Sequence, residues 1–430
     1  MATVSLRDEA VDLLQQLLRL NTVNPPGNET IAAELLRDYL EANGVEVQLL
    51  GRTPERANLV ARLEGGSGPS LCFLSHTDTV VADPSEWSRD PWSGDLADDH
   101  VWGRGALDMK NQVAASAVAI ASLARESFKP PGDLVFVAAA DEEVGKNFGL
   151  QWLCDEHPDA VRVDYAINEG GGERIVVAGQ PVYLCASAEK MSAPFTLRVH
   201  GRSGHASMPG IADNALVKAA PLIEKLAAYE PEPSIGPEVA GFLDAVLGEQ
   251  PPAGEVLERL RALDPLAAET IEPLLAFTLS PTMIEASERQ NVIPGTVELT
   301  VDRRLLPGQT PEEVDPIVRE LLGPGDYELE TIERWGGTRS PLDTPLWDAI
   351  SGWVGETEDG AKLAPYCCPG FTDSHWLREA FGTVAYGFFP LKTMETEVAA
   401  RLIHSADERT HVDDLVLGVD FLRHAAHSLG

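Results

Sequence analysis

Short apolar runs alternate with helical stripes along the first 170 residues, and this alternation restricts the possible folds more than any other feature. Apolar runs at 45–50, 58–63, 70–75, 134–139 and 163–167 predict strands. Helical spacing separates some of them, at 6–20, 29–42 and 111–125. The alternation predicts a doubly wound α/β domain, with a mixed, mainly parallel sheet flanked by helices.

The pattern changes near Met191, where alternating strands at 194–201 and 295–304 accompany a helix at 214–229. The proline-rich stretch 230–273 keeps apolar spacing and predicts short helices and turns rather than a linker. Helices and strands alternate again after Pro311. We therefore predict an inserted α+β domain at 192–306, and a first domain made of 1–191 and 307–430.

Composition excludes several partners and compartments. The net charge of −35 over 430 residues argues against nucleic acid and against anionic membranes. The five cysteines are odd in number and two are adjacent, so they predict no disulfide framework and favour a reducing, cytoplasmic compartment. Neither a signal peptide nor a membrane-spanning apolar stretch is predicted.

Five side chains of metal-binding type lie at the joints of the strand–helix pattern. They are His76, Asp108, Glu143, Glu169 and His404. Most of them follow an apolar run, and the carboxyl ends of strands converge at one edge of an open α/β sheet. Two histidines and three carboxylates without cysteine favour a hydrolytic zinc pair over a structural zinc.

Each of these residues also has an ordinary interpretation. His76 and Asp78 could be a solvated pair at a strand end, and Asp108 could simply cap a helix. Glu142 and Glu143 could belong to an acidic turn in water, and His404 could be a loop histidine. Only their joint order along the chain favours a shared site.

Three segments are specific in combination: His-x-Asp at 76–78, Gly-Arg-Gly-x-x-Asp-Met-Lys at 103–110 and Asp-Glu-Glu-x-Gly at 141–145. With them, nearly the full chain resembles the dinuclear zinc exopeptidase and amidohydrolase family, which includes glutamate carboxypeptidase, succinyl-diaminopimelate desuccinylase, acetylornithine deacetylase and aminoacylase. The resemblance implies that the insert is a ferredoxin-like dimerisation or lid domain. It also implies that the protein is a homodimer.

The resemblance further implies a role for each residue of the site. His76 and Glu169 would hold one zinc, Glu143 and His404 the other, and Asp108 would bridge them, with cobalt and manganese as alternative metals. Asp78 would support His76. Glu142 would act as general base and then as general acid.

Substrate residues are implied in the same way. His205, in the Gly-Ser loop 201–207, would stabilise the oxyanion across a dimer interface. Asn291 and Arg304 would bind the substrate carboxylate, although Arg303 stands beside Arg304 and could take its place. The segment 369–374 would line the site through Gly370 and Thr372, with the bulky Phe371 where the family has a glycine.

These residues predict a hydrolase that cleaves an amide or peptide bond next to a free carboxylate, as a carboxypeptidase or dipeptidase does. The alternative is an N-acyl amino acid deacylase of the acetylornithine deacetylase or succinyl-diaminopimelate desuccinylase type. The substrate would be a small peptide or an N-acyl amino acid. A metal-bound but non-catalytic protein on the same fold is disfavoured by Glu142 beside Glu143.

Overall fold

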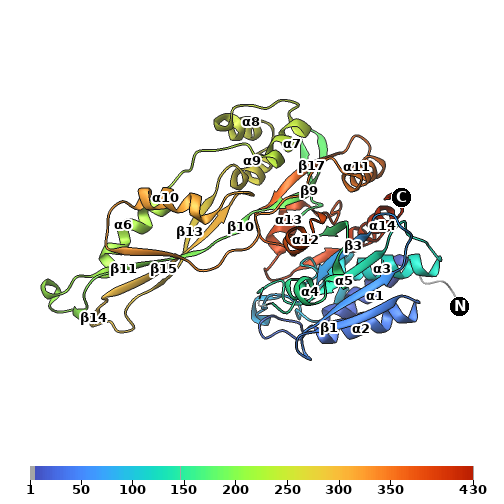
Figure 1. Ribbon diagram of the computed structural model, residues 1–430, viewed down its shortest axis with the longest axis horizontal. Helices are drawn as coiled ribbons and strands as arrows, with labels where there is room; N and C mark the ends of the chain where they lie inside the picture. The colour runs from blue at the N-terminus through green and yellow to red at the C-terminus, as the bar shows by residue number, and fades with distance from the viewer. Residues whose placement is uncertain (1–4, 146, 430) are drawn as a thin grey trace.

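The computed structural model describes residues 5–145 and 147–429. The molecule has two lobes: a larger body that carries both chain ends, and a smaller, extended lobe formed by the middle of the chain (Figure 1). Within the described residues, no helix has both the length and the apolarity needed to cross a membrane.

The body is built on one mixed sheet of nine strands, in the order β1-β2-β6-β3-β7-β18-β9-β17 with β8 beside β9. Its strands are β1 (Glu46–Gly51), β2 (Ala57–Leu63), β3 (Leu71–His76), β6 (Leu134–Ala139), β7 (Tyr165–Asn168), β8 (Arg174–Val177), β9 (Gln180–Glu189), β17 (Lys362–Cys368) and β18 (Val384–Gly387). The four central strands, β6, β3, β7 and β18, run parallel.

Helices cover both faces of this sheet. One face carries α1 (Leu6–Leu18), α2 (Thr30–Ala42), α3 (Lys110–Arg125), α11 (Pro345–Thr357) and α14 (Val412–Ser428). The other carries α4 (Leu150–Glu156), α5 (Pro158–Val161) and α12 (Ser374–Phe381). Phe73 points into the first layer, and its neighbours Cys72 and Leu74 point into the second. Burial on both faces is why these strands read as continuous apolar runs.

The smaller lobe is an antiparallel sheet with two helices. Its strands are β10 (Met191–Ser192), β11 (Phe195–His200), β13 (Thr278–Glu285), β15 (Thr296–Leu305) and β16 (Tyr327–Thr331). Its core includes residues of α6 (Ala215–Ala227) and α10 (Pro311–Leu322). The order β11-α6-β13-β15-α10-β16 is the ferredoxin-like βαββαβ arrangement. At its far end, β12 (Gly204–His205) pairs with β14 (Val292–Ile293).

Short helices from the middle of the insert pack on the body rather than on the smaller sheet. These are α7 (Pro237–Val246), α8 (Val256–Leu263) and α9 (Pro265–Ile271), whose apolar side chains join those of β8, β9 and β17 in one cluster. Conversely, β16 pairs with β11 although it lies beyond residue 306. We therefore propose that the domain boundary lies near residue 332 instead of 306, and that 237–274 belongs with the body.

The predicted fold class is confirmed: a mixed α/β body with parallel central strands, interrupted by an α+β insert. One small sheet of the body was not predicted. It joins β4 (Asp95–Ala97), β5 (His100–Trp102) and β19 (Arg409–His411). This sheet ties the end of the chain to the loop that precedes α3.

Candidate active site

Three neighbouring parallel strands deliver acidic and imidazole side chains to one edge of the body. His76 is the last residue of β3, Glu142 and Glu143 follow β6, and Glu169 comes directly after β7. Because β3 lies between β6 and β7 and runs parallel to both, these ends meet at the carboxyl edge of the sheet. Gly387 lets β18 approach closely, since an added Cβ would lie 2.0 Å from the carbonyl oxygen of Glu169.

Asp108 and His404 reach the same place by a different route. Pairing of β19 with β5 sets Arg409 opposite Trp102, which brings the segment after His404 next to the loop that holds Asp108. The buried carboxylate of Glu408 then fastens this loop. It accepts backbone N–H bonds from Gly105, Leu107 and Asp108 at 2.7–3.0 Å, and a bond from Arg104 at 2.6 Å.

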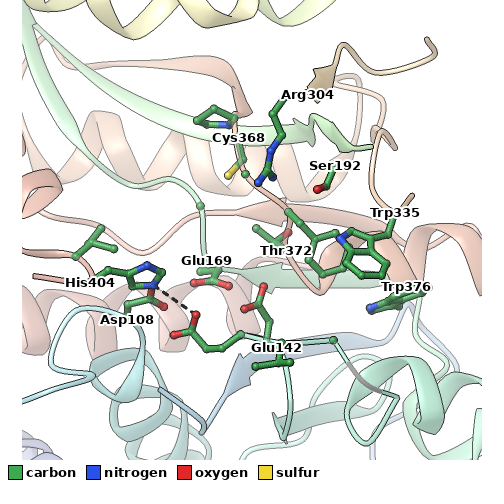
Figure 2. Close-up of a pocket in the computed structure, with 18 of the residues that line it drawn as sticks. Asp108, Glu142, Glu169, Ser192, Arg304, Trp335, Cys368, Thr372, Trp376 and His404 are labelled. Carbon is green, nitrogen blue, oxygen red and sulfur yellow. Dashed lines mark ion pairs between the residues drawn. The ribbon is translucent and has the colours of Figure 1, made fainter. Parts of the chain in front are cut away.

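The five predicted ligands form two groups that share Asp108. His76 Nε2 lies 3.2 Å from Asp108 Oδ1 and 3.6 Å from Glu169 Oε1. His404 Nε2 lies 3.0 Å from Asp108 Oδ2 and 3.4 Å from Glu143 Oε2. The two oxygens of Asp108 therefore face different groups, and in each group the ligand atoms lie within 4.8 Å of one another. Figure 2 shows Asp108 beside His404, with Glu142 and Glu169 facing the same space.

The chemistry of this donor set fits divalent cations. Burial raises the pKa of Glu143 and of Glu169, and neighbouring carboxylate charges, including that of Asp108, add to it. The Oε1 atom of Glu143 is buried without a hydrogen-bond partner. Carboxylates crowded in this way are stabilised when a cation is among them, and imidazole with carboxylate ligands suits zinc and related metals.

Asp78 stands behind the cluster and orders it. Its carboxylate accepts the backbone N–H groups of Glu142 and Glu143, at 3.2 and 3.1 Å, and lies 3.4 Å from His76 Nδ1. Asn24 donates to Asp78 at 2.9 Å and to Asp141 at 3.0 Å. Side chains held by several buried hydrogen bonds keep their position without help from substrate.

Glu142 is adjacent to the ligands but belongs to neither group. Its Oε2 lies 3.9 Å from His76 Nε2. Burial raises its pKa well above the ordinary value, and the negative charge of Glu169 raises it further. A carboxylate in such surroundings holds a proton more readily, which suits a group that must accept and return one.

A cavity of about 620 Å³ opens above the cluster. Asp108, Glu142, Glu143, Glu169 and His404 line its floor, and the predicted substrate residues Arg304, Gly370 and Thr372 line it as well. Figure 2 shows Arg304 above the carboxylates, on the opposite side of the cavity. Both lobes therefore contribute to the cavity.

Arg304, and not Arg303, faces this cavity. Arg303 is completely buried and forms an ion pair with Asp315 at 2.5 Å. Its guanidinium also donates to the Thr331 hydroxyl at 3.0 Å. The guanidinium of Arg304 is half-buried and held by Asp302 at 2.9 Å. The alternation of the β15 strand separates the two arginines, because successive side chains point to opposite faces.

His205 and Asn291 do not line the cavity. Both are exposed at the far end of the insert, where the Ala206 N–H donates to the Asn291 carbonyl at 2.9 Å. Figure 1 places β14, the strand that pairs with His205, at the end of the smaller lobe most remote from the sheet of the body. Within one chain, these two predicted residues are apart from the rest of the site.

Several cavity residues were missed by the sequence analysis. Trp335, Tyr366 and Trp376 line the cavity, and so does Glu173, whose Oε2 is buried without a partner. The aromatic residues carry no ligand or motif pattern, so nothing distinguishes them from core residues in the sequence. Glu408 had a signal, since it directly follows the His404 segment, but its partners are some 300 positions away.

The chain combines a mixed α/β body, an acidic cluster at the carboxyl edge of its parallel strands and a cavity between two lobes. These features agree with the exopeptidase and amidohydrolase family that the sequence resembles. A family model described as Peptidase family M20/M25/M40 matches residues 72–428. The chain belongs to this family. The membership confirms the predicted family and reaction class, because it makes the protein a hydrolase.

Individual relatives agree over nearly the full length. N-fatty-acyl-amino acid synthase/hydrolase PM20D1 of Xenopus tropicalis is 28% identical over 440 residues, covering 96% of this chain and 85% of the relative. Aminoacylase-1 of Sus scrofa is 28% identical over 425 residues, covering 96% and 93%. The M20 family metallo-carboxypeptidase Sso-CP2 of Sulfolobus solfataricus has a similar fold, with a TM-score of 0.73, 18% identity and coverage of 98% and 99%.

Proposed function

We propose that the protein is a dinuclear-metal hydrolase that cleaves an amide or peptide bond beside a free carboxylate. The observation that carries the proposal is the sharing of Asp108 between two ligand groups, one with His76 and Glu169 and one with Glu143 and His404. We propose zinc as the metal, with cobalt or manganese as alternatives, because histidine and carboxylate ligands suit all three.

The side chains divide the work of the reaction. Two divalent cations at this site would polarise the scissile carbonyl and make water more acidic. Glu142 would take the proton from the attacking water and pass it to the nitrogen of the leaving amine. Asp78 would keep His76 in place through the contact with its Nδ1 atom, the ring nitrogen turned away from the ligand group.

Arg304 supplies the charge that selects the substrate. Its guanidinium lies across the cavity from the acidic floor, and a planar fork of donors matches a carboxylate in two parallel hydrogen bonds. A substrate with its carboxylate at Arg304 would extend towards the ligand groups with its amide. Gly370 and Thr372 would border it between these two points.

Two bond types satisfy these requirements. A carboxypeptidase or dipeptidase cleaves a peptide bond next to a terminal carboxylate, and an N-acyl amino acid deacylase cleaves an amide in the same position. Similarity over 96% of the chain to an aminoacylase and to an enzyme named for N-fatty-acyl-amino acids supports the second candidate.

We further propose that the enzyme works as a homodimer. Among the residues that the structure describes, none pairs with the outer edge of β13, and this strand exposes Met283 (59%) and Ile284 (47%). Near it, α6 exposes Val217 (67%) and Leu216 (43%). An apolar edge strand of this kind is usually covered by a partner. A second copy could also bring His205 and Asn291 to the cavity of the first.

For the compartment, we propose a reducing cytoplasm. The five cysteines are all free, four of them are buried, and no pair is bonded. Disulfides are rare where thiols are kept reduced. The net charge of −35 supports a small-molecule substrate rather than nucleic acid or an anionic membrane.

The proposal is tested with metal-free protein prepared with a chelator and reloaded with zinc, cobalt or manganese. Release of amino acid is measured with a panel of dipeptides and a panel of N-acyl amino acids. We expect activity only after reloading, in at least one panel, and two equivalents of bound metal. Undiminished activity in excess chelator, or no release from either panel by fully loaded protein, would refute it.

The shared ligand allows a sharper version of this test. In Asp108→Ala both groups lose a ligand, so we expect metal content to fall from two equivalents towards zero. His404→Ala affects one group only, and we expect it to retain one equivalent. Equal losses of metal in the two variants would contradict the proposal that both ligand groups share Asp108.

A further inference from the structure

Arg304 lies in a row with two other cavity residues, each on a different backbone segment. Ser192 of β10 pairs with Arg304 of β15, and Ser192 also pairs with Trp335, which follows β16. The Ser192 N–H donates to the Trp335 carbonyl at 2.8 Å, and the Trp335 N–H donates back at 3.1 Å. Directly paired residues project to the same side, and all three line the cavity.

Trp335 begins an aromatic wall that continues on the other lobe. The ring of Phe371 lies 6.4 Å from that of Trp335, centroid to centroid, and 5.8 Å from that of Trp376. All three side chains are only half-buried, and all three line the cavity. Figure 2 shows Trp335 and Trp376 together, on the side of the cavity away from His404. We call Trp335, Phe371 and Trp376 the aromatic wall.

Arg304 and the aromatic wall are close enough for one bound amino acid to contact both. Two strand spacings separate Arg304 from Trp335, or about 10 Å between Cα atoms. A guanidinium, a carboxylate and an aromatic ring fill a span of that size. The residue between them is serine, whose small side chain leaves the space open. Half-buried aromatic faces gain most from another ring, through apolar area and through edge-to-face contact.

We infer that the cavity selects substrates whose leaving amino acid carries a large aromatic side chain. This inference rests on the proposed function. The α-carboxylate binds Arg304, the side chain lies against the aromatic wall, and the amide nitrogen points towards Glu142. Trp335 and Phe371 are therefore specificity-determining residues, and the substrates are N-acyl aromatic amino acids or dipeptides that end in one.

A substrate series with one constant acyl group tests this inference. We expect kcat/KM for N-acetyl-tryptophan and N-acetyl-phenylalanine to exceed that for N-acetyl-alanine at least about tenfold. In Trp335→Ala this ratio should fall about tenfold, because KM rises for the aromatic substrates. Trp335→Phe should recover part of the ratio. If Trp335 has only a structural role, kcat/KM should fall by the same factor for all substrates, and this result would overturn the inference.

Phe128→Ala is the matched control. Phe128 is a half-buried aromatic residue beyond the C-terminal end of α3, about 24 Å along that helix from the Asp108 end. Removing its ring should leave the ratio between aromatic and alanine substrates unchanged. A change as large as that in Trp335→Ala would show that the ratio reports stability instead of recognition.

Binding to a catalytically impaired variant separates this inference from the proposed function. In metal-loaded Glu142→Gln, calorimetry should find N-acetyl-tryptophan bound at least about tenfold more tightly than N-acetyl-alanine, and Trp335→Ala should remove the difference. Equal binding of the two compounds overturns the inference even if the enzyme hydrolyses both. If Glu142→Gln binds N-acetyl-tryptophan preferentially but the unmutated enzyme hydrolyses neither compound, the aromatic subsite is supported and the proposed hydrolysis is refuted.

Discussion

The floor of the cavity and the far end of the insert hold predicted site residues under opposite physical conditions. On the floor, the backbone N–H groups of Asp108 and Glu143 donate to buried carboxylates, and both side chains meet a histidine within one chain. At the end of the insert, His205 is exposed on the short strand β12, and the exposed Asn291 directly precedes the strand β14 that pairs with it. Among the described residues, neither of them lines the cavity. Both candidate ligand groups therefore form within one chain, whereas the far end of the insert contributes to neither of them.

The difference indicates whether the residues of each region act within one subunit or between subunits. Parallel strands of one sheet bring their ends together regardless of other molecules, so the fold alone brings His76, Glu143 and Glu169 together. We propose that His205 reaches a cavity only in an associated subunit, because an exposed residue at the tip of the insert lies away from the cavity of its own chain. Mutations in the floor should therefore act within a subunit, and mutations at the tip should act between subunits.

The largest effect is expected in the floor, from Glu142→Gln. The amide cannot accept a proton from water, so activity should fall about 10²–10⁴-fold while metal content stays at the unmutated level. Steady-state kinetics and metal analysis of the same preparation check this. Glu34→Gln, on the exposed face of α2, is the control and should change neither. Unchanged activity in Glu142→Gln would remove Glu142 from the mechanism.

The next effect concerns the tip. His205→Ala should lower activity about 10²–10³-fold if the imidazole stabilises the developing oxyanion. Mixing His205→Ala subunits with Glu142→Gln subunits should then restore about a quarter of full activity, since half of the dimers are mixed and each has one intact site. Activity assays on the mixture make the measurement, and separated mixed dimers should show about half of full activity.

Two outcomes of the mixing experiment decide the comparison. Activity in the mixed dimers places the His205 function in the neighbouring subunit. Verified mixed dimers without activity would show that His205 does not act across the interface. Val217→Asp, on the exposed face of α6, should weaken the dimer and lower activity even though the floor is intact, as sedimentation and kinetics would show.

The smallest effect tests how firmly the floor is held. In Glu408→Gln, the amide nitrogen would replace one carboxylate oxygen and face the backbone N–H of either Gly105 or Leu107, at a cost of about 1–3 kcal/mol in folding stability. Displacement of the Asp108 loop should weaken metal binding about 10–100-fold, measured by chelator competition. Glu358→Gln, which loses its ion pair with Arg174 away from the cavity, should lower stability without changing metal affinity.

Much of the body was predictable because its signals are local. The apolar runs predicted β2, β3 and β6 to within one residue at each end, since strands buried on both faces must be apolar throughout. His76 and Glu169 could be singled out because they stand where such runs end. The ferredoxin-like insert was harder, because its boundary depends on β16 pairing with β11.

Distant pairings are what the sequence could not supply. The helices α7–α9 fall within the predicted insert but pack on the body, and apolar spacing alone does not say which surface a helix covers. In the same way, nothing local connects Trp335 to Ser192, or Glu408 to the Asp108 loop. These contacts exist only when segments far apart in the chain are brought together.

Residue type, strand position and order along the chain predicted by themselves the α/β class, the five ligand candidates and the neighbouring Glu142. The tertiary structure decided which oxygen of Asp108 faces which histidine, that Arg304 rather than Arg303 enters the cavity, and that an aromatic wall stands beside it. The reason is geometric. A candidate ligand can be recognised from its residue type, but a cavity forms between segments that are far apart in the sequence and meet only in the folded chain.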